Sequence, residues 1–568
     1  MITERVDDIP LILAEFEKSN LSNLLCQYFP NHGNWQGADG GQVAIIFLTY
    51  VLSCSDHRIS HVETWAEQRL TTLKCCLNNP NLSSKDLTDD KLGALLDKFS
   101  DEDRWNSFEH AHNQRLINVY DLNLEGEAIR LDAMITQSHR AASGDFQFGH
   151  SKQHRSDLPQ LKTMVATLDP FAMPLYSLTV SGNTSDDVLY LPVLEELMNN
   201  LTMHHQLFVG DSKMGSLNTR AQIQLRAHYY LIPLNKKQCS TKELAAYLAD
   251  KPTELVTVNQ EDKAGNSKIK AQAFERTKIM VDEAQDFSWE ERRIIVYSPA
   301  YAKRQQFAFE DRLVKAQNAL QLLLEPKQGR KQAKTSLELE ANVTKILKKH
   351  KVQGFIAYQI KEYQTTKTVR AHLDRPEEIR ISIHFSLEFE IDEVAKELHL
   401  QKLGWRVYAC NAPLKRLSTT QAIECYRNEY KIEHKFDELL NRITALMPVY
   451  LHKPKRIKAL IHLLLLALKY VSLIQYQVRT ELKATKQNIK ELYPGNPGRA
   501  TDKPTTRMLL KAFDNITLVI MPIGDKTIVK ISDLKPIQLK ILELLKLPPE
   551  TYSRFNELIF SHFDFSET

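Results

Sequence analysis

The sequence has 568 residues, of which 43% are hydrophobic and 25% are charged, with a formal net charge of +4. This composition is typical of a globular protein with room for several domains, and it excludes collagen-like, low-complexity and mainly disordered chains. The small net charge excludes a uniformly basic surface, so nucleic-acid binding would have to use local patches.

Cysteine usage and the apolar segments indicate an intracellular protein that does not enter membranes. The seven cysteines are scattered without a C-x-x-C pair, which predicts reduced thiols and no structural zinc site. Residues 1–20 lack the apolar core of a signal peptide. The most apolar run, 459–474, contains His462 and Lys469 and is short for a bilayer, so we expect a buried core helix.

Residues 1–122 are predicted to form an all-helical domain. Apolar residues recur at helical spacing over 10–29 and 40–53. Between these stretches lies a segment rich in Gly, Asn and Pro, which ends the first helical stretch before the second begins.

The hydrophobic period changes near residue 128, where residues 123–234 are predicted to form an α/β core. Short apolar runs separated by turn signals predict strands, and longer runs at helical spacing predict helices. The strands are expected at 127–136, 161–169, 173–182, 206–212 and 228–234, and the helices at 186–201 and 216–227. The predicted order is therefore β-β-β-α-β-α-β.

The rest of the chain is predicted to hold an insertion, a return to the core and a small C-terminal unit. Residues 235–400 are more polar and are interpreted as an insertion that contains both helices and strands. Residues 401–490 return to the core with a strand, a helix starting at Ser418–Gln421 and a long apolar helix. Residues 491–568 contain a linker rich in Pro and Gly and then the C-terminal unit.

Three acidic residues lie at informative places in this pattern. Asp132 lies within the first strand, Asp211 ends the fourth, and Glu433 lies on the later helix. One interpretation is that the two aspartates cap turns at strand ends. However, this order of elements is the ribonuclease-H-like arrangement, in which the first and fourth strands are neighbours. Carboxylates brought together in this way suit Mg²⁺, and a pair of such ions can catalyse phosphoryl transfer.

Residues 125–475 contain an ordered set of distinctive segments: RLDAMIT, FGHSKQHRSDLPQLKTMVATLD, MPLYSLTVSGNTSD, LFVGDSKMGSLNT, YRNEYKIEHKF and PVYLHKPKRIKALIHLLLLAL. Through these segments the chain has a resemblance to the DDE transposases of bacterial insertion sequences, in the group with a Y-x-x-R-x-x-x-E-x-x-x-x-x-x-K signature. It implies that Asp132, Asp211 and Glu433 are the catalytic metal ligands, and that the cofactor is Mg²⁺ or Mn²⁺, with two ions.

The signature is incomplete, because Glu429 replaces its Arg and Leu440 replaces its Lys. Glu429 lies one helical turn from Glu433, so either residue could be the third ligand, although Glu433 holds the family position. The resemblance implies that other residues contact DNA phosphates, and the candidates are Lys152, His154, Arg155, Tyr426, Arg427, Lys431 and Lys435. Asp157 could instead be a structural partner of Arg155.

The expected activity is metal-dependent cleavage of DNA at the ends of an insertion sequence, followed by strand transfer into target DNA. The family also implies binding to terminal inverted repeats, a homodimer on DNA and a bacterial cytoplasmic, nucleoid-associated location. Trp289 and Trp405 could stack on an unpaired base, but ordinary core packing is the favoured interpretation. The alternatives are a nuclease without strand transfer and, because of the signature changes, a catalytically impaired transposase-derived protein that binds specific DNA.

Overall fold

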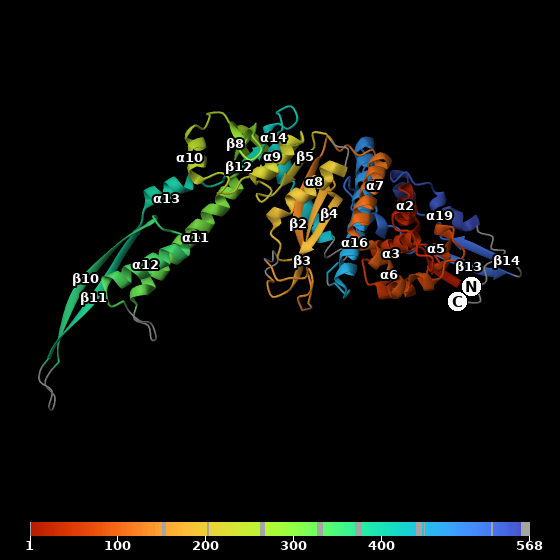
Figure 1. Ribbon diagram of the computed structural model, residues 1–568, viewed down its shortest axis with the longest axis horizontal. Helices are drawn as coiled ribbons and strands as arrows, with labels where there is room; N and C mark the ends of the chain where they lie inside the picture. Colours follow the sequence, from red (N-terminus) through yellow and green to blue (C-terminus); the bar gives the residue numbers. More distant parts are fainter. Residues whose placement is uncertain are drawn as a thin grey trace. The chain divides into compact units, whose positions relative to one another are not determined.

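The computed structural model describes residues 2–139, 141–149, 155–200, 204–261, 267–325, 333–369, 378–438, 446–447, 449–523 and 526–557 (Figure 1). The chain forms two compact units. The first comprises Met1–Ile232, Met280–Trp289 and Glu424–Thr568, and the second comprises Pro233–Ile279 and Glu290–Ile423. The boundaries of the five domains given above stay predictions.

The N-terminal part of the first unit is helical, as its apolar spacing predicts. The helices are α1 (Ile9–Lys18), α2 (Leu21–Tyr28), α3 (Gly40–Cys54), α4 (Val62–Glu67), α5 (Leu70–Leu77), α6 (Asp89–Phe99) and α7 (Glu102–Tyr120). Asp39, Thr88 and Asp101 cap α3, α6 and α7, because each side chain accepts a hydrogen bond from the backbone N–H three residues later.

A short strand that the sequence did not predict joins this region to the C-terminal unit. Strand β1 (Ile2–Arg5) pairs antiparallel with β13 (Thr517–Ile523), which pairs with β14 (Lys526–Ile531). The C-terminal helices are α17 (Thr506–Lys511), α18 (Pro536–Leu544) and α19 (Glu550–Ser553). The predicted mixture of helix and strand pieces is therefore present, and its sheet includes residues from both ends of the chain.

Helix α16 (Pro454–Thr485) is the core helix of the first unit and packs against α3, α6, α18 and strand β4. It is long and apolar enough to cross a membrane, but 94% of its most apolar 18-residue window is buried inside the protein. Its buried Lys469 donates a 2.7 Å hydrogen bond to Asn113 and pairs with Glu109 at 3.2 Å. Because the buried charge has partners, the helix can occupy a protein core, as expected for this run.

The mixed sheet of the first unit has the predicted ribonuclease-H-like topology. It contains β2 (Ala128–Gln137), β3 (Gln160–Leu168), β4 (Met173–Ser181), β5 (Leu207–Gly210) and β6 (Tyr229–Pro233). Within this unit the strands lie in the order β4-β3-β2-β5-β6, and β2 pairs parallel with β5. Helices α8 (Tyr190–Asn200) and α9 (Leu217–Leu225) connect the strands. The fold class and the adjacency of the first and fourth strands are confirmed.

The second unit is a mixture of helices and strands that includes most of the predicted insertion and continues to Ile423. Its elements are α10 (Thr241–Ala249), β7 (Val256–Glu261), β8 (Ser267–Asp282), β9 (Phe287–Tyr297), α11 (Pro299–Leu324), α12 (Ser336–His350), β10 (Ile356–Val369), β11 (Glu378–Ile391), α13 (Glu393–Leu400) and β12 (Trp405–Cys410). Residues 280–289, at the turn between β8 and β9, belong to the first unit. Strand β12 pairs antiparallel with β9. The 16-residue strand β8 was not predicted, because its charged residues obscure the alternating pattern.

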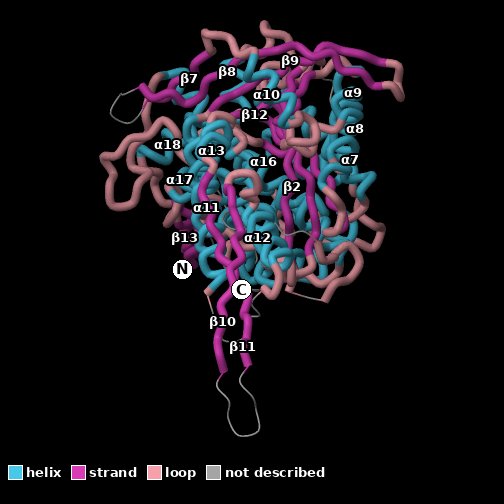
Figure 2. Tube along the Cα trace, turned by 90° about the vertical axis from the view of Figure 1, so that its left-hand side faces the viewer, coloured by secondary structure: helices cyan, strands magenta, loops and turns pink. Residues whose placement is uncertain are grey.

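Strands β10 and β11 form a separate two-stranded ribbon, visible in Figure 2. One end of the ribbon packs against α11 and α12 through a buried cluster that includes Phe309, Leu347 and Ile356. Further along β11, the alternating side chains of Ile379, Ile381 and Ile383 are 50–67% exposed.

Candidate active site

Asp132 lies near the middle of β2, where its side chain is half-buried. Its backbone is opposite Val165 of β3, and its Oδ1 accepts a 2.7 Å hydrogen bond from the N–H of Ala133. On the other side, β2 runs parallel to β5, with Leu131 opposite Gly210. Asp132 follows Leu131 on β2 and Asp211 follows Gly210 of β5, so strand pairing brings these two aspartates side by side.

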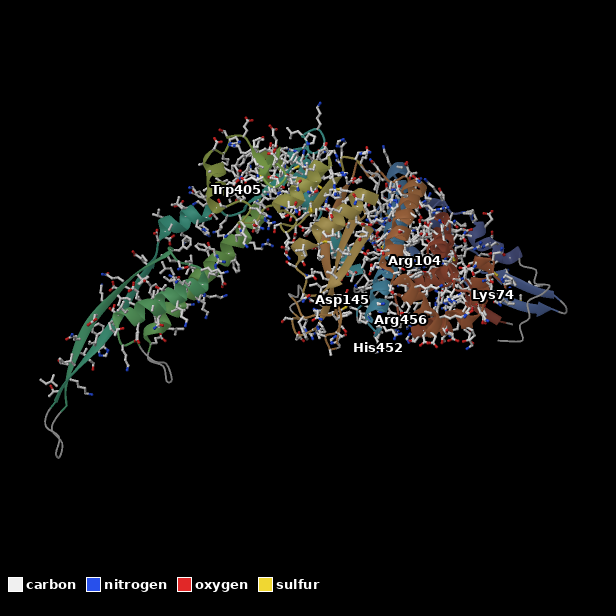
Figure 3. The ribbon with its side chains drawn as sticks, in the orientation of Figure 1. Lys74, Arg104, Asp145, Trp405, His452 and Arg456 are labelled. Atoms are coloured by element: carbon white, nitrogen blue, oxygen red, sulfur yellow. The ribbon has the colours of Figure 1, made fainter. Side chains whose placement is uncertain are left out.

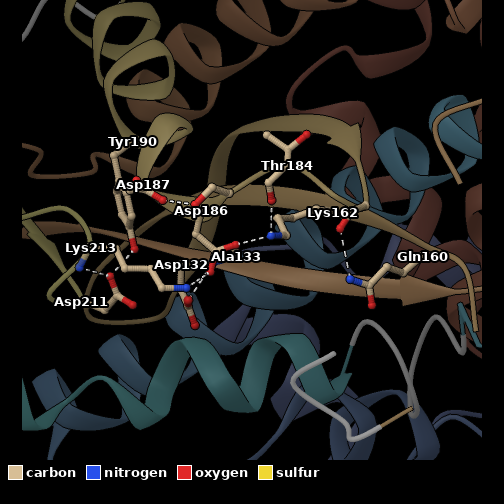
Figure 4. A network of polar contacts seen from close by, with 12 residues as sticks. Asp132, Ala133, Gln160, Lys162, Thr184, Asp186, Asp187, Tyr190, Asp211 and Lys213 are labelled. Carbon is tan, nitrogen blue, oxygen red and sulfur yellow. Dashed lines mark hydrogen bonds and ion pairs between the residues drawn. The ribbon is translucent and has the colours of Figure 1, made fainter. Parts of the chain in front are cut away.

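Asp211 directly follows β5, and two hydrogen bonds orient its carboxylate (Figure 4). The hydroxyl of Tyr190 and the backbone N–H of Lys213 both donate to Oδ1 of Asp211 at 2.8 Å. Burial and the charges of Asp211 and Asp132 hold the pKa of Tyr190 well above its usual range, so its hydroxyl stays protonated. Tyr190 is therefore a permanent donor to Asp211. Sequence analysis missed this residue, because 20 residues separate it from the aspartate.

The helix predicted to carry the third carboxylate is divided into two. Helix α14 (Thr419–Arg427) starts where predicted, since Ser418 and Gln421 exchange side-chain-to-backbone hydrogen bonds. It ends before Asn428, and α15 (Tyr430–Asp437) begins two residues later. The backbone stays nearly helical through this step but tightens to three-residue hydrogen bonds, as from Glu429 to Tyr426 at 3.2 Å.

Glu429 and Glu433 flank the start of α15, which packs against β2. Glu433 is exposed and Glu429 is half-buried. Burial raises the pKa of Glu429, and the charges of Asp132, Glu433 and Asp211 raise it further, opposed by a hydrogen bond from Tyr426. The other three carboxylates are thus close enough to Glu429 to repel its charge. Leu440, the last signature position, lies outside the described residues.

A group of neighbouring carboxylates is the donor chemistry that a hard divalent cation requires. The residues therefore fit such a cation chemically. In the described part of the chain, however, no three His, Cys, Asp or Glu side chains are arranged closely enough to hold a single ion. The Mg²⁺ or Mn²⁺ site and the number of ions stay predictions.

A buried arginine connects the strand of Asp132 to helix α14. Arg130 lies two residues before Asp132 on the same face of β2, and its guanidinium pairs with Asp169 at 2.7 Å. The same group donates a 2.6 Å hydrogen bond to the carbonyl oxygen of Cys425, in the last turn of α14. Sequence analysis did not select Arg130, although a charge within an apolar strand is a signal for a buried partner.

Two lysines share one carboxylate beside these acids, and sequence analysis missed this cluster as well. Lys162 of β3 pairs with Oδ1 of Asp186 at 2.5 Å, and the ammonium of Lys213 pairs with Oδ2. Lys162 also donates to the carbonyl oxygen of Thr184 at 2.5 Å. The position of Lys213, two residues after Asp211, was the available signal in the sequence.

The predicted DNA-binding residues have different surroundings. Lys152 and His154 lie outside the described residues. Arg155 is exposed and bound to Asp157 by two 2.8 Å hydrogen bonds, so the structural pairing considered for Asp157 is present.

On the helices, Tyr426 is buried, while Arg427 and Lys431 are half-buried. Lys435 is engaged within the protein, and its phosphate contact stays a prediction. Its side chain is 6% exposed, and it pairs with Glu438 at 2.5 Å. Burial lowers its pKa, against the opposing effect of Glu438.

Two basic residues at the start of α16 and the two tryptophans considered for base stacking are engaged in structural contacts. At the start of α16, Arg456 pairs with Asp97 and Lys458 with Asp145, each at 2.7 Å. Arg456 and Asp145 are labelled in Figure 3. Trp289 is 6% exposed and donates a 2.8 Å hydrogen bond to Tyr230. Trp405 packs on Phe274 and Tyr297. Core packing is therefore the role of both tryptophans, as the sequence favoured.

Residues 127–469 match the family model of the transposase DDE domain, which spans more than half of the chain. No curated protein matches. Among solved structures, a piggyBac transposase in a synaptic complex with hairpin DNA is 11% identical, with a TM-score of 0.23. The match covers 49% of this chain and 61% of that chain, and at this TM-score it supports no structural argument.

Proposed function

The chain belongs to the DDE transposase family, and from this premise we propose that it cuts DNA at insertion-sequence ends and joins the cut strand to target DNA. One observation carries the proposal. Asp132 and Asp211 follow paired residues of neighbouring parallel strands, and both they and Glu433 lie within electrostatic range of Glu429 on the helical segment. A group of carboxylates gathered in this way is suited to metal-dependent phosphoryl transfer.

We assign Asp132, Asp211 and Glu433 as the metal ligands, with Mg²⁺ as the natural ion, Mn²⁺ as a substitute and two ions per site. When bound, such ions supply Lewis-acid activation of the attacking oxygen and neutralise charge on the phosphate. The protein residues position these ligands. Tyr190 and the N–H of Lys213 fix the carboxylate of Asp211, and Arg130 fixes the helix end nearest Glu429.

The proposed reaction has two in-line substitutions at phosphorus. In the first, water attacks the phosphodiester at the end of the element, the bond to the 3′ oxygen breaks, and a 3′-hydroxyl is released. In the second, this hydroxyl attacks a phosphodiester of target DNA and displaces the 3′ oxygen of the target strand. Each step forms one P–O bond and breaks another, so no redox partner is needed. The protein's contribution is orientation and charge neutralisation.

The partners in this proposal are the terminal inverted repeats and target DNA, bound by a homodimer that pairs two ends in the bacterial cytoplasm. We place the metal-ligand role of Glu433 above that of Glu429, because Glu433 is the exposed residue at the family position. An exposed carboxylate is free to coordinate an ion without first losing buried contacts.

Cleavage and joining of a duplex that carries the ends of the encoding element test the proposal. Wild type in Mg²⁺ should yield both cut and joined products, and Asp132→Ala, Asp211→Ala and Glu433→Ala should yield neither. Glu424→Ala is a matched control, since Glu424 is an exposed carboxylate on α14 and should retain activity.

Each of the other possible results indicates a different activity. Cut products that are never joined indicate a nuclease. Specific binding of the ends without cutting indicates a catalytically impaired DNA-binding protein. Activity that survives Glu433→Ala but is lost in Glu429→Ala shows that our third ligand is wrong.

A further inference from the structure

Lys162, Asp186 and Lys213 form a small charged cluster next to the candidate metal ligands (Figure 4). Two ammonium groups face a single carboxylate, so the cluster has one positive charge in excess. Hydrogen bonds from both lysines lower the pKa of Asp186, although burial alone would raise it. The carboxylate is therefore ionised, and the excess positive charge persists at neutral pH.

The two lysines differ in their freedom to leave Asp186. The side chains of Lys162 and Asp186 are each 7% exposed, whereas that of Lys213 is 45% exposed. Lys162 is held a second time by the carbonyl of Thr184. The Lys162–Asp186 pair is thus a fixed part of the fold. In the Lys213–Asp186 pair the carboxylate is buried but the ammonium is half-exposed, so the lysine side chain is the partner that can rotate away into solvent.

Lys213 is tied to the candidate metal ligands through its backbone. Its N–H donates to Oδ1 of Asp211 at 2.8 Å, so its Cα position is fixed relative to that carboxylate. Burial opposes the charge on its ammonium, but Asp186, Asp211 and Asp187 together raise its pKa. Lys213 therefore remains protonated and lies in the electrostatic field of the acidic group.

We propose that the ammonium of Lys213 binds a non-bridging oxygen of a DNA phosphate next to the acidic group, and that this phosphate replaces Asp186 as its partner. The inference rests on the proposed function and adds a phosphate-binding residue to it. Lysine binds phosphate as a compact point charge on a flexible stem, so a change of partner requires only rotation of its side chain. Asp186 keeps Lys162 after the exchange, so no buried carboxylate is left without a counter-ion.

The test measures the salt dependence of DNA binding in EDTA, where no cleavage occurs. The affinity for a labelled duplex of the element's end is measured between 50 and 200 mM salt for four proteins: wild type, Lys213→Ala, Lys213→Arg and Lys540→Ala. Lys540 is the matched control, because it is a 35% exposed lysine that pairs with Glu543 at 3.0 Å in the C-terminal unit. Loss of one phosphate contact reduces the slope of log affinity against log salt by about 0.9. Over this range wild-type affinity should fall about 3.5-fold more than that of Lys213→Ala.

A second measurement locates the phosphate. Methylphosphonate linkages, which remove one phosphate charge each, are placed singly at the positions flanking the cut. At the position bound by Lys213, the neutral linkage should lower the DNA-binding affinity of wild type but should not lower that of Lys213→Ala any further.

The outcomes separate the inference from the function on which it rests. A reduced slope in Lys213→Ala, restored in Lys213→Arg and absent from Lys540→Ala, supports the inference. The inference is wrong if all four proteins have the same slope of log affinity against log salt. It is also wrong if every neutral linkage lowers the DNA-binding affinity of wild type and Lys213→Ala equally. Either result would count against the inference even if wild type cuts and joins the same duplex in Mg²⁺. If wild type neither binds nor cuts the duplex, the proposed function fails and the inference fails with it.

Discussion

Substitution of Tyr190 by Phe tests whether the orientation of Asp211 matters for the chemistry. The change removes only the hydroxyl that donates to Asp211 at 2.8 Å and leaves the buried ring in place. A hydrogen bond to a charged acceptor contributes about 1.5–3 kcal/mol net. If that amount is lost in the transition state, cleavage slows by about 10- to 150-fold. Single-turnover cleavage of the element's end in saturating Mg²⁺ measures this rate.

Tyr120→Phe is the matched control for this experiment. The hydroxyl of Tyr120 donates to Glu15 at 2.7 Å, so the substitution removes a similar tyrosine–carboxylate hydrogen bond within the same unit. Both variants should melt at a lower temperature, but only Tyr190→Phe should cut more slowly. A wild-type cleavage rate in Tyr190→Phe would refute the claim that this hydroxyl positions Asp211 for catalysis.

Three further predictions concern stability. Glu429→Gln should raise the melting temperature at pH 7 in the absence of metal, but not at pH 4. The reason is that a carboxyl group whose pKa is raised in the folded state lowers the stability of the protein as the pH rises from the ordinary carboxyl pKa through the raised one. In calorimetric scans, added Mg²⁺ should reduce this increase in melting temperature. Arg130→Met should lower the unfolding free energy in urea by about 3–5 kcal/mol, because it leaves Asp169 buried without its partner; a loss below about 1 kcal/mol would contradict this. Burial raises the pKa of Asp8 to about 7, so wild type should lose stability as pH rises from about 4 to 7. Asp8→Asn should therefore be the more stable protein at pH 8, by up to roughly 4 kcal/mol, and an equal melting temperature there would refute the shift.

The hydrophobic period and the family motifs predicted the core sheet because each strand is short, apolar and bounded by turns. Asp132 and Asp211 were found in this way, since a carboxylate within or directly after an apolar strand is conspicuous. The helix start at Ser418 was also predicted, because its capping partner Gln421 is only three residues away. These features depend on local sequence, which single-chain patterns contain.

The residues that support the acidic group depend on contacts between distant segments. Arg130 meets Cys425, Tyr190 meets Asp211, and Lys162 reaches the same carboxylate as Lys213. None of these contacts follows from spacing along the chain, because the fold decides which loop faces which strand. The burial of Lys435 could not be predicted for the same reason, since only the structure reveals it.

The pairing of β1 with β13 has a consequence for how the protein is made. Ile2 pairs with Ile520, so the first strand leaves the ribosome long before its partner exists. At about 5–20 residues per second, the interval is roughly 25–100 s. During this time the early helices can form, but the backbone N–H and C=O groups of β1 have no partner strand and are accessible to chaperones or proteases. Translation that stops before β13 leaves this edge permanently open, so closure of the small sheet reports that synthesis has passed residue 517.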